Sequence, residues 1–178
     1  MGYAETHRRS IEDPEGYWSE RAAELHWYTP WEQVLDAGNP PFYRWFVGGT
    51  TNLCYNAVDR HALGARRGHA ALIFESAETG QSRTLTFFEL YREVNRLAGV
   101  LKNLGVRKGD RVLIYMPMVP EAIIGMLACV RLGAIHSVVF GGFASSSLAQ
   151  RIDDAEPVLV LTADASMRKG LPVPLKPM

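Results

Sequence analysis

The sequence predicts an α/β fold: an incomplete, mostly parallel sheet with covering helices, preceded by a helical, aromatic-rich extension. From about residue 69 onward, apolar runs of strand length alternate with runs of helical periodicity. The later strand-length runs are apolar on both faces, which is typical of a parallel sheet that helices cover. The first 66 residues differ, because they contain all four tryptophans of the chain and show no strand-like alternation.

The extension, residues 1–66, contains short helical runs such as residues 14–25, and Asn39-Pro40-Pro41 interrupts it. Clustered aromatic side chains more often fill a core or an interface than stack on bases, and no basic residues interleave with them here. We therefore expect the extension to pack on another part of the protein. Its tryptophans are Trp18, Trp27, Trp31 and Trp45.

A hairpin and a helix are expected next. Residues 70–74 and 83–86 have strand character, and the turn-prone run Glu78-Thr79-Gly80 lies between them. Thr86 then begins a helix as its N-cap, and Glu89, three residues later, completes a capping box.

The remainder of the chain alternates strictly between strand and helix. This order predicts parallel pairing, because each helix carries the chain back to the end of the sheet where the next strand starts. The expected elements are the strand 111–116, a helix between Pro120 and Gly133, the strand 135–140, the helix 145–154 and the last strand, 158–161.

Charge and composition exclude several classes of partner. The chain has 19 Lys and Arg residues against 19 Asp and Glu residues, so no net field attracts nucleic acid or an anionic membrane surface. The most apolar stretch, residues 112–130, is interrupted by Pro117, Pro120 and Glu121, which does not suit a membrane span. We expect neither a nucleic-acid partner nor a membrane partner.

The two cysteines, Cys54 and Cys129, are far apart in the sequence and flanked by apolar residues. We expect both to be reduced core residues rather than a disulfide or a metal site. No signal peptide is visible near the start of the sequence. These features favour a reducing compartment, the cytoplasm or, in a eukaryote, the mitochondrial matrix.

No standard catalytic signature occurs, so no catalytic residue and no metal ligand is assigned. The patterns GxGxxG, GxxxxGK(S/T), HExxH and GxSxG are all absent from the sequence. The run Asp59-Arg60-His61 combines an acid, a cation and a base. Adjacent side chains point in different directions, however, so we expect a capping or salt-bridge role for this run.

Two loops are candidate binding sites. Phe140-Gly141-Gly142 follows a predicted parallel strand on the crevice side of the sheet, where ligands bind and glycine lets a backbone approach them. Its position fits a ligand site and a plain tight turn equally well. Arg168-Lys169-Gly170 also follows a strand end and suits a phosphate, although a basic pair in a loop is more often solvated surface.

Long strings of the sequence resemble a known family. They are FVGG at residues 46–49, TNLCYNAVDRH at residues 51–61, IYMPM at residues 114–118 with Glu121, and a run over residues 126–145 that includes GAIHSVVFGGFAS. With these strings the chain resembles the AMP-forming short-chain acyl-CoA synthetases, that is, the acetyl- and propionyl-CoA synthetase family. The resemblance is strongest to the propionate–CoA ligase branch and covers nearly the whole chain.

The resemblance implies a ligase that activates a short-chain carboxylate, propionate or acetate, with ATP and Mg²⁺ and then transfers the acyl group to CoA. Carboxylate, ATP and CoA are the implied small-molecule substrates. In that family an Arg-Gly-Gly-Lys segment contacts the nucleotide end of CoA, and it aligns with Arg168, Lys169, Gly170 and Leu171. Lys169 replaces a glycine and Leu171 replaces the terminal base, which moves or weakens one positive charge.

The phosphate loop, the acyl pocket, the adenine contacts and the catalytic lysine of that family all lie downstream of these strings. We therefore expect an amino-terminal fragment that lacks the residues binding ATP and Mg²⁺ and is inactive alone. Its expected parts are the extension, residues 1–66, and the truncated first part of the large AMP-binding (adenylate-forming) domain, residues 67–178. The alternatives are a non-catalytic nucleotide- or CoA-binding module and a truncated interaction fragment.

Overall fold

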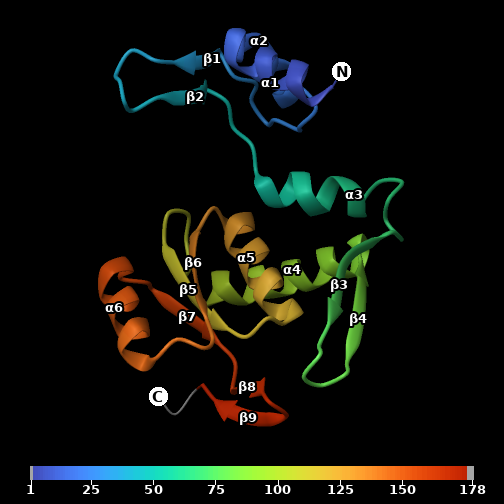
Figure 1. The fold of residues 1–178 in the computed structure, drawn as a ribbon, viewed down its shortest axis with the longest axis vertical. Coiled ribbons are helices and arrows are strands. Elements are labelled where there is room, and N and C mark those ends of the chain that lie inside the picture. Colours follow the sequence, from blue (N-terminus) through green and yellow to red (C-terminus); the bar gives the residue numbers. More distant parts are fainter. Residues whose placement is uncertain (1, 176–178) are drawn as a thin grey trace. The chain divides into compact units, whose positions relative to one another are not determined.

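The computed structural model describes residues 2–175. Its contacts group the chain into two compact units, Met1–Asn52 and Leu53–Met178, and each unit contains its own helices and strands (Figure 1). Between residues 2 and 175, no helix combines the length and the apolar character that crossing a membrane requires.

The first unit begins with two helices, α1 (Tyr3–Glu12) and α2 (Pro14–Ala22). Pro14 suits the start of α2, because the first helical turn has no use for its missing N–H. Asp13 precedes it as the N-cap, and its carboxylate accepts a hydrogen bond from the Gly16 N–H at 3.1 Å. The expected helical run is present, although it ends at Ala22 rather than at residue 25.

A short antiparallel hairpin follows, and it corrects one expectation. β1 (Gln33–Asp36) pairs with β2 (Arg44–Val47), with Leu35 opposite Trp45. The expectation that the extension contains no strands is therefore wrong. Each strand has only 4 residues, too few for a two-residue alternation of apolar and polar side chains to be visible in the sequence.

Aromatic side chains pack against one another in this unit. The Trp27 ring lies 5.0 Å from Trp31 and 5.4 Å from Phe46, and Trp31 lies 5.3 Å from Phe46, measured between ring centroids. These spacings are typical of aromatic packing, and the three side chains are partly buried. Trp18 and Trp45 contact each other and remain 42% and 43% exposed.

The second unit starts with a π-helical turn, η1 (Tyr55–Asp59), and the short helix α3 (Arg60–Ala62). The predicted hairpin is confirmed as β3 (Ala70–Glu75) paired antiparallel with β4 (Ser82–Thr86). It leads directly into the long helix α4 (Phe87–Asn103).

The predicted capping box at the start of α4 is confirmed. The Thr86 hydroxyl accepts a hydrogen bond from the Glu89 N–H at 3.2 Å, and the Glu89 carboxylate accepts one from the Thr86 N–H at 2.8 Å. The bond from the Thr86 backbone, followed by the one from its hydroxyl, holds the pKa of Glu89 below its usual value. The box fixes where the hairpin ends and the helix begins.

The alternating part of the chain folds into the predicted parallel sheet. Its order is β6-β5-β7, and both pairings with the central strand are parallel (Figure 1). The elements are β5 (Arg111–Met116), α5 (Pro120–Leu132), β6 (Ile135–Phe140), α6 (Ser145–Ala155) and β7 (Leu159–Thr162). These findings confirm the α/β fold.

β7 is not the last strand, which corrects a second expectation. β8 (Ala165–Arg168) and β9 (Leu171–Pro174) form a further antiparallel hairpin. β9 contains Pro172 and Pro174, and prolines within a run argue against a strand. Leu171 closes the ladder opposite Arg168, so Pro172 and Pro174 fall at the alternate, non-hydrogen-bonded positions where no N–H is needed.

The helices cover the parallel sheet from both sides. One buried cluster joins α4 and α5 to Val112 of β5, and Leu159 and Leu161 of β7 pack against it. The other cluster joins Leu113 and Tyr115 of β5 to Val139 of β6, with α6 packed against it. Successive residues of β5 thus face opposite layers, which explains why this strand is apolar throughout.

One arginine ties three helical segments of the second unit together. The Arg131 guanidinium on α5 donates hydrogen bonds to the carboxylate of Asp59, to the amide oxygen of Asn95 and, at 3.3 Å, to the sulfur of Cys54. The Arg131 and Asp59 side chains are only 16% and 17% exposed. The salt-bridge role expected for Asp59 is confirmed.

Candidate functional site

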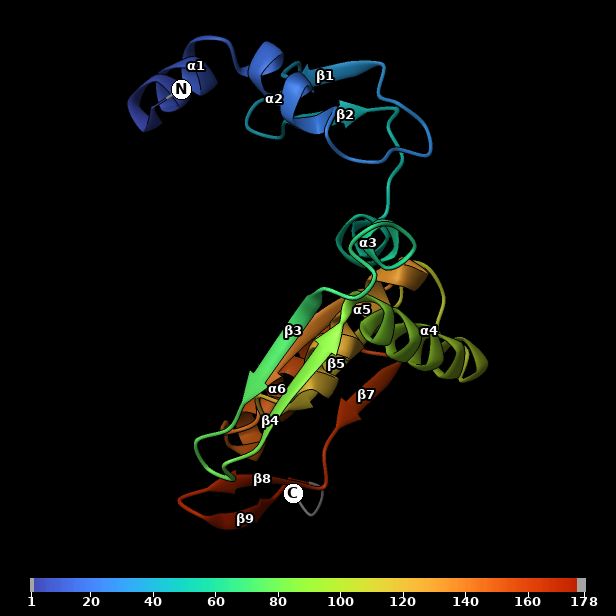
Figure 2. The same ribbon diagram turned by 90° about the vertical axis from the view of Figure 1, so that its right-hand side faces the viewer.

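A cavity of about 1080 Å³ lies at the carboxyl ends of β5 and β6, and we call it the strand-end cavity. Its wall is formed by the β3–β4 hairpin tip, the β5–α5 loop, the β6–α6 loop and the β8–β9 hairpin. The β3–β4 tip and the β8–β9 hairpin lie side by side in both ribbon views (Figures 1 and 2). The volume is slightly above about 300–1,000 Å³, the usual range for small-molecule sites.

The sheet topology explains why a hollow forms here. β5 and β6 are neighbours, yet α5 packs on one face of the sheet and α6 on the other. The loops that follow the two strands, residues 117–119 and 141–144, therefore leave in opposite directions and leave a crevice between them. Open α/β sheets bind ligands at such a point.

The turn predicted from Phe140-Gly141-Gly142 lines this cavity. A Cβ atom on Gly141 would lie 3.1 Å from the backbone of Met116 and Pro117, so glycine lets the two loops pass closely. This steric requirement accounts for Gly141 without any ligand. Both interpretations of the turn, ligand site and tight turn, are compatible with its position.

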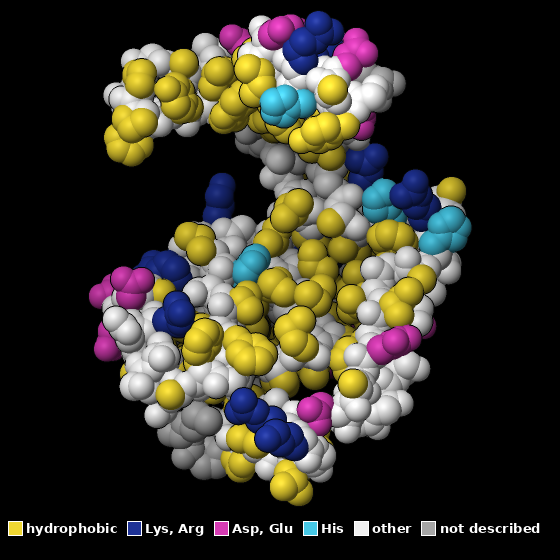
Figure 3. Space-filling view, in the orientation of Figure 1, with side chains coloured by type: hydrophobic (Ala, Val, Ile, Leu, Met, Phe, Trp, Pro, Cys, Tyr) yellow, Lys and Arg dark blue, Asp and Glu magenta, His cyan; other side chains and the backbone are white. Residues whose placement is uncertain are grey.

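The second predicted site, Arg168-Lys169-Gly170 with Leu171, is a two-residue hairpin turn. Arg168 and Leu171 are the paired residues that close the β8–β9 ladder, and Lys169 and Gly170 connect them with φ angles of 52° and 75°. Arg168 lines the strand-end cavity together with Phe140-Gly141-Gly142, whereas the other three turn residues are not part of its lining. Basic side chains lie over this hairpin at the lower edge of the unit (Figure 3).

Charged side chains of both signs line the cavity. Arg83 on β4 forms an ion pair with Glu121 at the start of α5, with 3.2 Å between Nη1 and Oε1. Arg168 forms no ion pair with any residue between 2 and 175. Its guanidinium is therefore available to an anion that enters the cavity.

The sequence did not predict that Glu78 contacts the β8–β9 turn. The Gly170 N–H donates a hydrogen bond of 3.0 Å to the Glu78 carboxylate, although 92 positions separate the two residues. In the sequence, Glu78 is only one member of a turn-prone run. No local signal indicates which distant backbone group a hairpin tip will contact.

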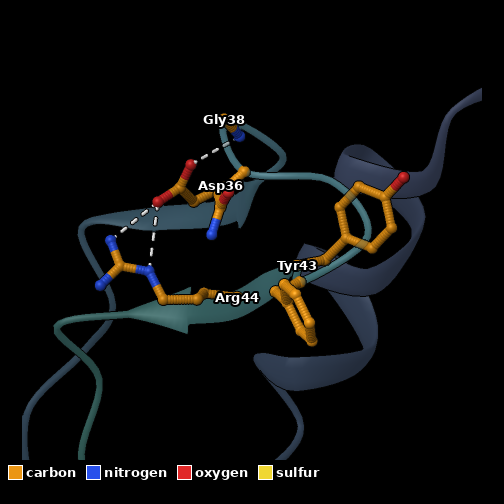
Figure 4. Close-up of a pocket in the computed structure, with 6 residues that line it drawn as sticks. Asp36, Gly38, Tyr43 and Arg44 are labelled. Atoms are coloured by element: carbon orange, nitrogen blue, oxygen red, sulfur yellow. Dashed lines mark hydrogen bonds and ion pairs between the residues drawn. The ribbon is translucent and has the colours of Figure 1, made fainter.

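A second cavity, of about 450 Å³, lies in the loop of the β1–β2 hairpin (Figure 4). The Asp36 carboxylate accepts hydrogen bonds from the Gly38 N–H at 3.0 Å and from the Arg44 guanidinium at 2.7 Å. These two partners, the backbone N–H first, hold the pKa of Asp36 below its usual value. Because Asp36 and Arg44 satisfy each other, this arrangement stabilises the hairpin.

The thiols fit the sequence expectation. Cys54 and Cys129 are buried and free of disulfides, and burial raises the pKa of both thiols, that of Cys129 to about 11. Among residues 2–175, no group of three or more His, Cys, Asp or Glu side chains is placed to hold a metal ion.

Comparisons with known proteins connect this geometry to a family. Residues 3–57 match the acetyl-coenzyme A synthetase N-terminus, and residues 58–176 match the AMP-binding enzyme family. The chain is 56% identical over 176 residues to the propionate–CoA ligase of Escherichia coli (strain K12), covering 99% of this chain and 28% of that protein. It is 55% identical over 164 residues to the acetyl-coenzyme A synthetase of Gemmatimonas aurantiaca, covering 92% of this chain and 25% of that protein.

A solved structure agrees with these sequence matches. The acetoacetyl-CoA synthetase from Streptomyces lividans superposes with a TM-score of 0.89 at 31% identity, covering 98% of this chain and 27% of that one. The chain thus spans about a quarter of the length of the relatives that it matches. The family match covers most of the chain and includes the whole of the strand-end cavity, and the chain belongs to the AMP-binding enzyme family.

Proposed function

We propose that this chain contributes to an acyl-CoA synthetase that activates a short-chain carboxylate, propionate or acetate, with ATP and transfers the acyl group to CoA. Both relatives described above carry names of such ligases, one for propionate and one for acetate. The identities of 56% and 55% are nearly equal, so they do not separate the two carboxylates.

Within that enzyme, the proposed role of this chain is to bind the nucleotide end of CoA. The observation that carries this proposal is the position of Arg168, an arginine without an ion-pairing partner among the described residues, on the wall of a cavity at the sheet's switch point. A guanidinium there would donate charge-assisted hydrogen bonds to a phosphate of CoA. Lys169, Gly170 and Leu171 belong to the same proposed site, with the Gly170 N–H as a second donor.

Adenylation chemistry is proposed to depend on residues outside this chain. Mg²⁺ bound with ATP would supply positive charge beside the phosphates. Among the described residues, no group of three or more His, Cys, Asp or Glu side chains is placed to hold such an ion. The proposed division into an extension, residues 1–66, and the first part of the adenylate-forming domain, residues 67–178, follows from the same proposal. The free cysteines of the chain support a site of action in a reducing compartment such as the cytoplasm.

A chimaera tests the proposed function. Residues 1–178 would replace the matching segment of the Escherichia coli propionate–CoA ligase, and the control would be the 178-residue chain alone. We expect the chimaera to catalyse carboxylate-dependent exchange of pyrophosphate into ATP and to form the CoA thioester. The chain alone should catalyse neither reaction, because its sequence contains no phosphate-loop pattern that would position cations and donors around the triphosphate.

Two results would contradict the proposal. Propionate- or acetate-stimulated exchange by the purified chain alone would show that the adenylation machinery lies within these residues. A folded chimaera that retains neither half-reaction would show that this segment does not do what its counterpart does in the ligase.

A further inference from the structure

The hydrogen bond between Gly170 and Glu78 joins two hairpins at the rim of the strand-end cavity. Glu78 lies in the β3–β4 tip and lines the cavity, and its Oε2 atom accepts the Gly170 N–H at 3.0 Å. The β3–β4 tip and the β8–β9 hairpin adjoin in Figures 1 and 2. The Glu78 carboxylate thus already accepts the hydrogen bond of the Gly170 N–H, in the same turn that contributes Arg168.

A carboxylate oxygen and a phosphate oxygen can each accept the hydrogen bond of a backbone N–H. Both are anionic acceptors, and both form charge-assisted hydrogen bonds with such donors. The N–H of Gly170 has a single hydrogen to donate, so it serves one strong acceptor at a time. Glu78 also brings a negative charge to the side of the turn where an anion would approach.

We propose that Glu78 is a gate on the anion site of the β8–β9 turn. In the ligand-free molecule its carboxylate holds the Gly170 N–H, and a phosphate group that binds beside Arg168 must displace it. The gate regulates the CoA site and therefore rests on the function proposed above. Displacement would free the β3–β4 tip, so phosphate binding and opening of the cavity rim are coupled.

The competing interpretation is that the bond only fastens the two hairpins together. A fastening would preorganise the turn, and its removal would weaken the binding of anions. If Glu78 is a gate, removal of its carboxylate strengthens the binding of anions. Because the two interpretations differ in sign, the affinity of a variant without the carboxylate separates them.

The experiment titrates the 178-residue chain with CoA by calorimetry and follows the Gly170 amide by NMR, using the parent and the variants Glu78→Ala, Glu75→Ala and Arg168→Ala. Glu75→Ala is the matched control, since it removes the same charge from the wall of the same cavity and leaves the hydrogen bond of the Gly170 N–H in place. For Glu78→Ala we expect CoA to bind about three- to tenfold more tightly, the factor by which a mostly closed gate lowers apparent affinity. Glu75→Ala should tighten binding less, and the Gly170 resonance should move in Glu78→Ala before any ligand is added.

Each outcome separates this gate from the proposed function. If Arg168→Ala weakens CoA binding but Glu78→Ala binds no more tightly than the parent, the gate is wrong and the CoA site stands. If no variant binds CoA, the proposed function fails, and titration with inorganic pyrophosphate then tests the gate through the Gly170 amide. An amide that responds to pyrophosphate equally in the parent and in Glu78→Ala overturns the gate, whereas a response at lower concentration in Glu78→Ala supports it.

Discussion

Lys169 adopts a left-handed backbone conformation, with φ of 52°, in a turn whose other central residue is Gly170. A residue with a Cβ atom pays roughly 1–2 kcal/mol in this region, whereas glycine does not. Lys169→Gly should therefore stabilise the second unit by about 1 kcal/mol, somewhat less than the strain because glycine also makes the unfolded chain more flexible. The measurement is the free energy of unfolding in urea.

Lys169→Ala is the matched control for this prediction, because it removes the same charge and retains the Cβ atom. We expect the stability of Lys169→Ala to remain near that of the parent. Equal gains in both variants would assign the effect to charge rather than to the backbone.

Cys129 lies fully buried on α5, and burial raises the pKa of its thiol from 9.0 to about 11. The neutral thiol is thus favoured in the folded state, so its contribution to stability is complete below pH 9 and declines as the pH rises toward 11. Alkylation by iodoacetamide needs the thiolate. In the native chain at pH 8, Cys129 should react far more slowly than in urea, as mass spectrometry of the labelled peptides would show. Equally fast labelling of native and unfolded chains would contradict its burial.

At the scale of elements, Arg131 is the contact that holds η1, α4 and α5 together. Removing one partner of a largely buried ion pair leaves the other without compensation, which costs roughly 3–5 kcal/mol. Arg131→Ala should lose about this much in free energy of unfolding, measured by denaturation.

A double-mutant cycle assigns that loss to the pair. If Arg131 and Asp59 act through each other, Asp59→Ala in the background of Arg131→Ala should cost much less than it does alone. Additive costs would instead mean that Arg131 acts through Asn95, Cys54 or its packing.

The elements that sequence analysis predicted are those with strong local signals. Thr86 and Glu89 mark the start of α4, and the continuous apolar run of β5 marks a strand buried on both faces. The β1–β2 and β8–β9 hairpins lack such signals. Their strands have 4 residues each, and β9 carries two prolines that only the pairing register makes acceptable.

The same limit applies to the candidate site. Phe140-Gly141-Gly142 and Arg168 were found in the sequence because each follows a strand end, and the fold brings them to one cavity wall. Glu78 could not be found, because its role depends on a contact 92 residues away in the chain. The pattern of apolar residues in the sequence identifies where strands end, whereas only the tertiary structure shows which loops contact each other.

At the scale of the whole molecule, the sheet, the cavity and the family match concern the same residues. The switch point between β5 and β6 forms the hollow, and two hairpins from distant parts of the chain complete its rim. In the enzyme that we propose, this segment recognises CoA and the remaining residues carry out adenylation.

The most direct test compares the two half-reactions in the chimaera with and without Arg168→Ala. A charge-assisted hydrogen bond to phosphate contributes on the order of 1.5–3 kcal/mol, so the KM for CoA should rise roughly ten- to hundredfold. Propionate-dependent pyrophosphate exchange should stay nearly unchanged, because CoA takes no part in adenylation. If both half-reactions fall together, Arg168 supports the fold; if neither changes, the β8–β9 turn does not bind CoA and the account is wrong.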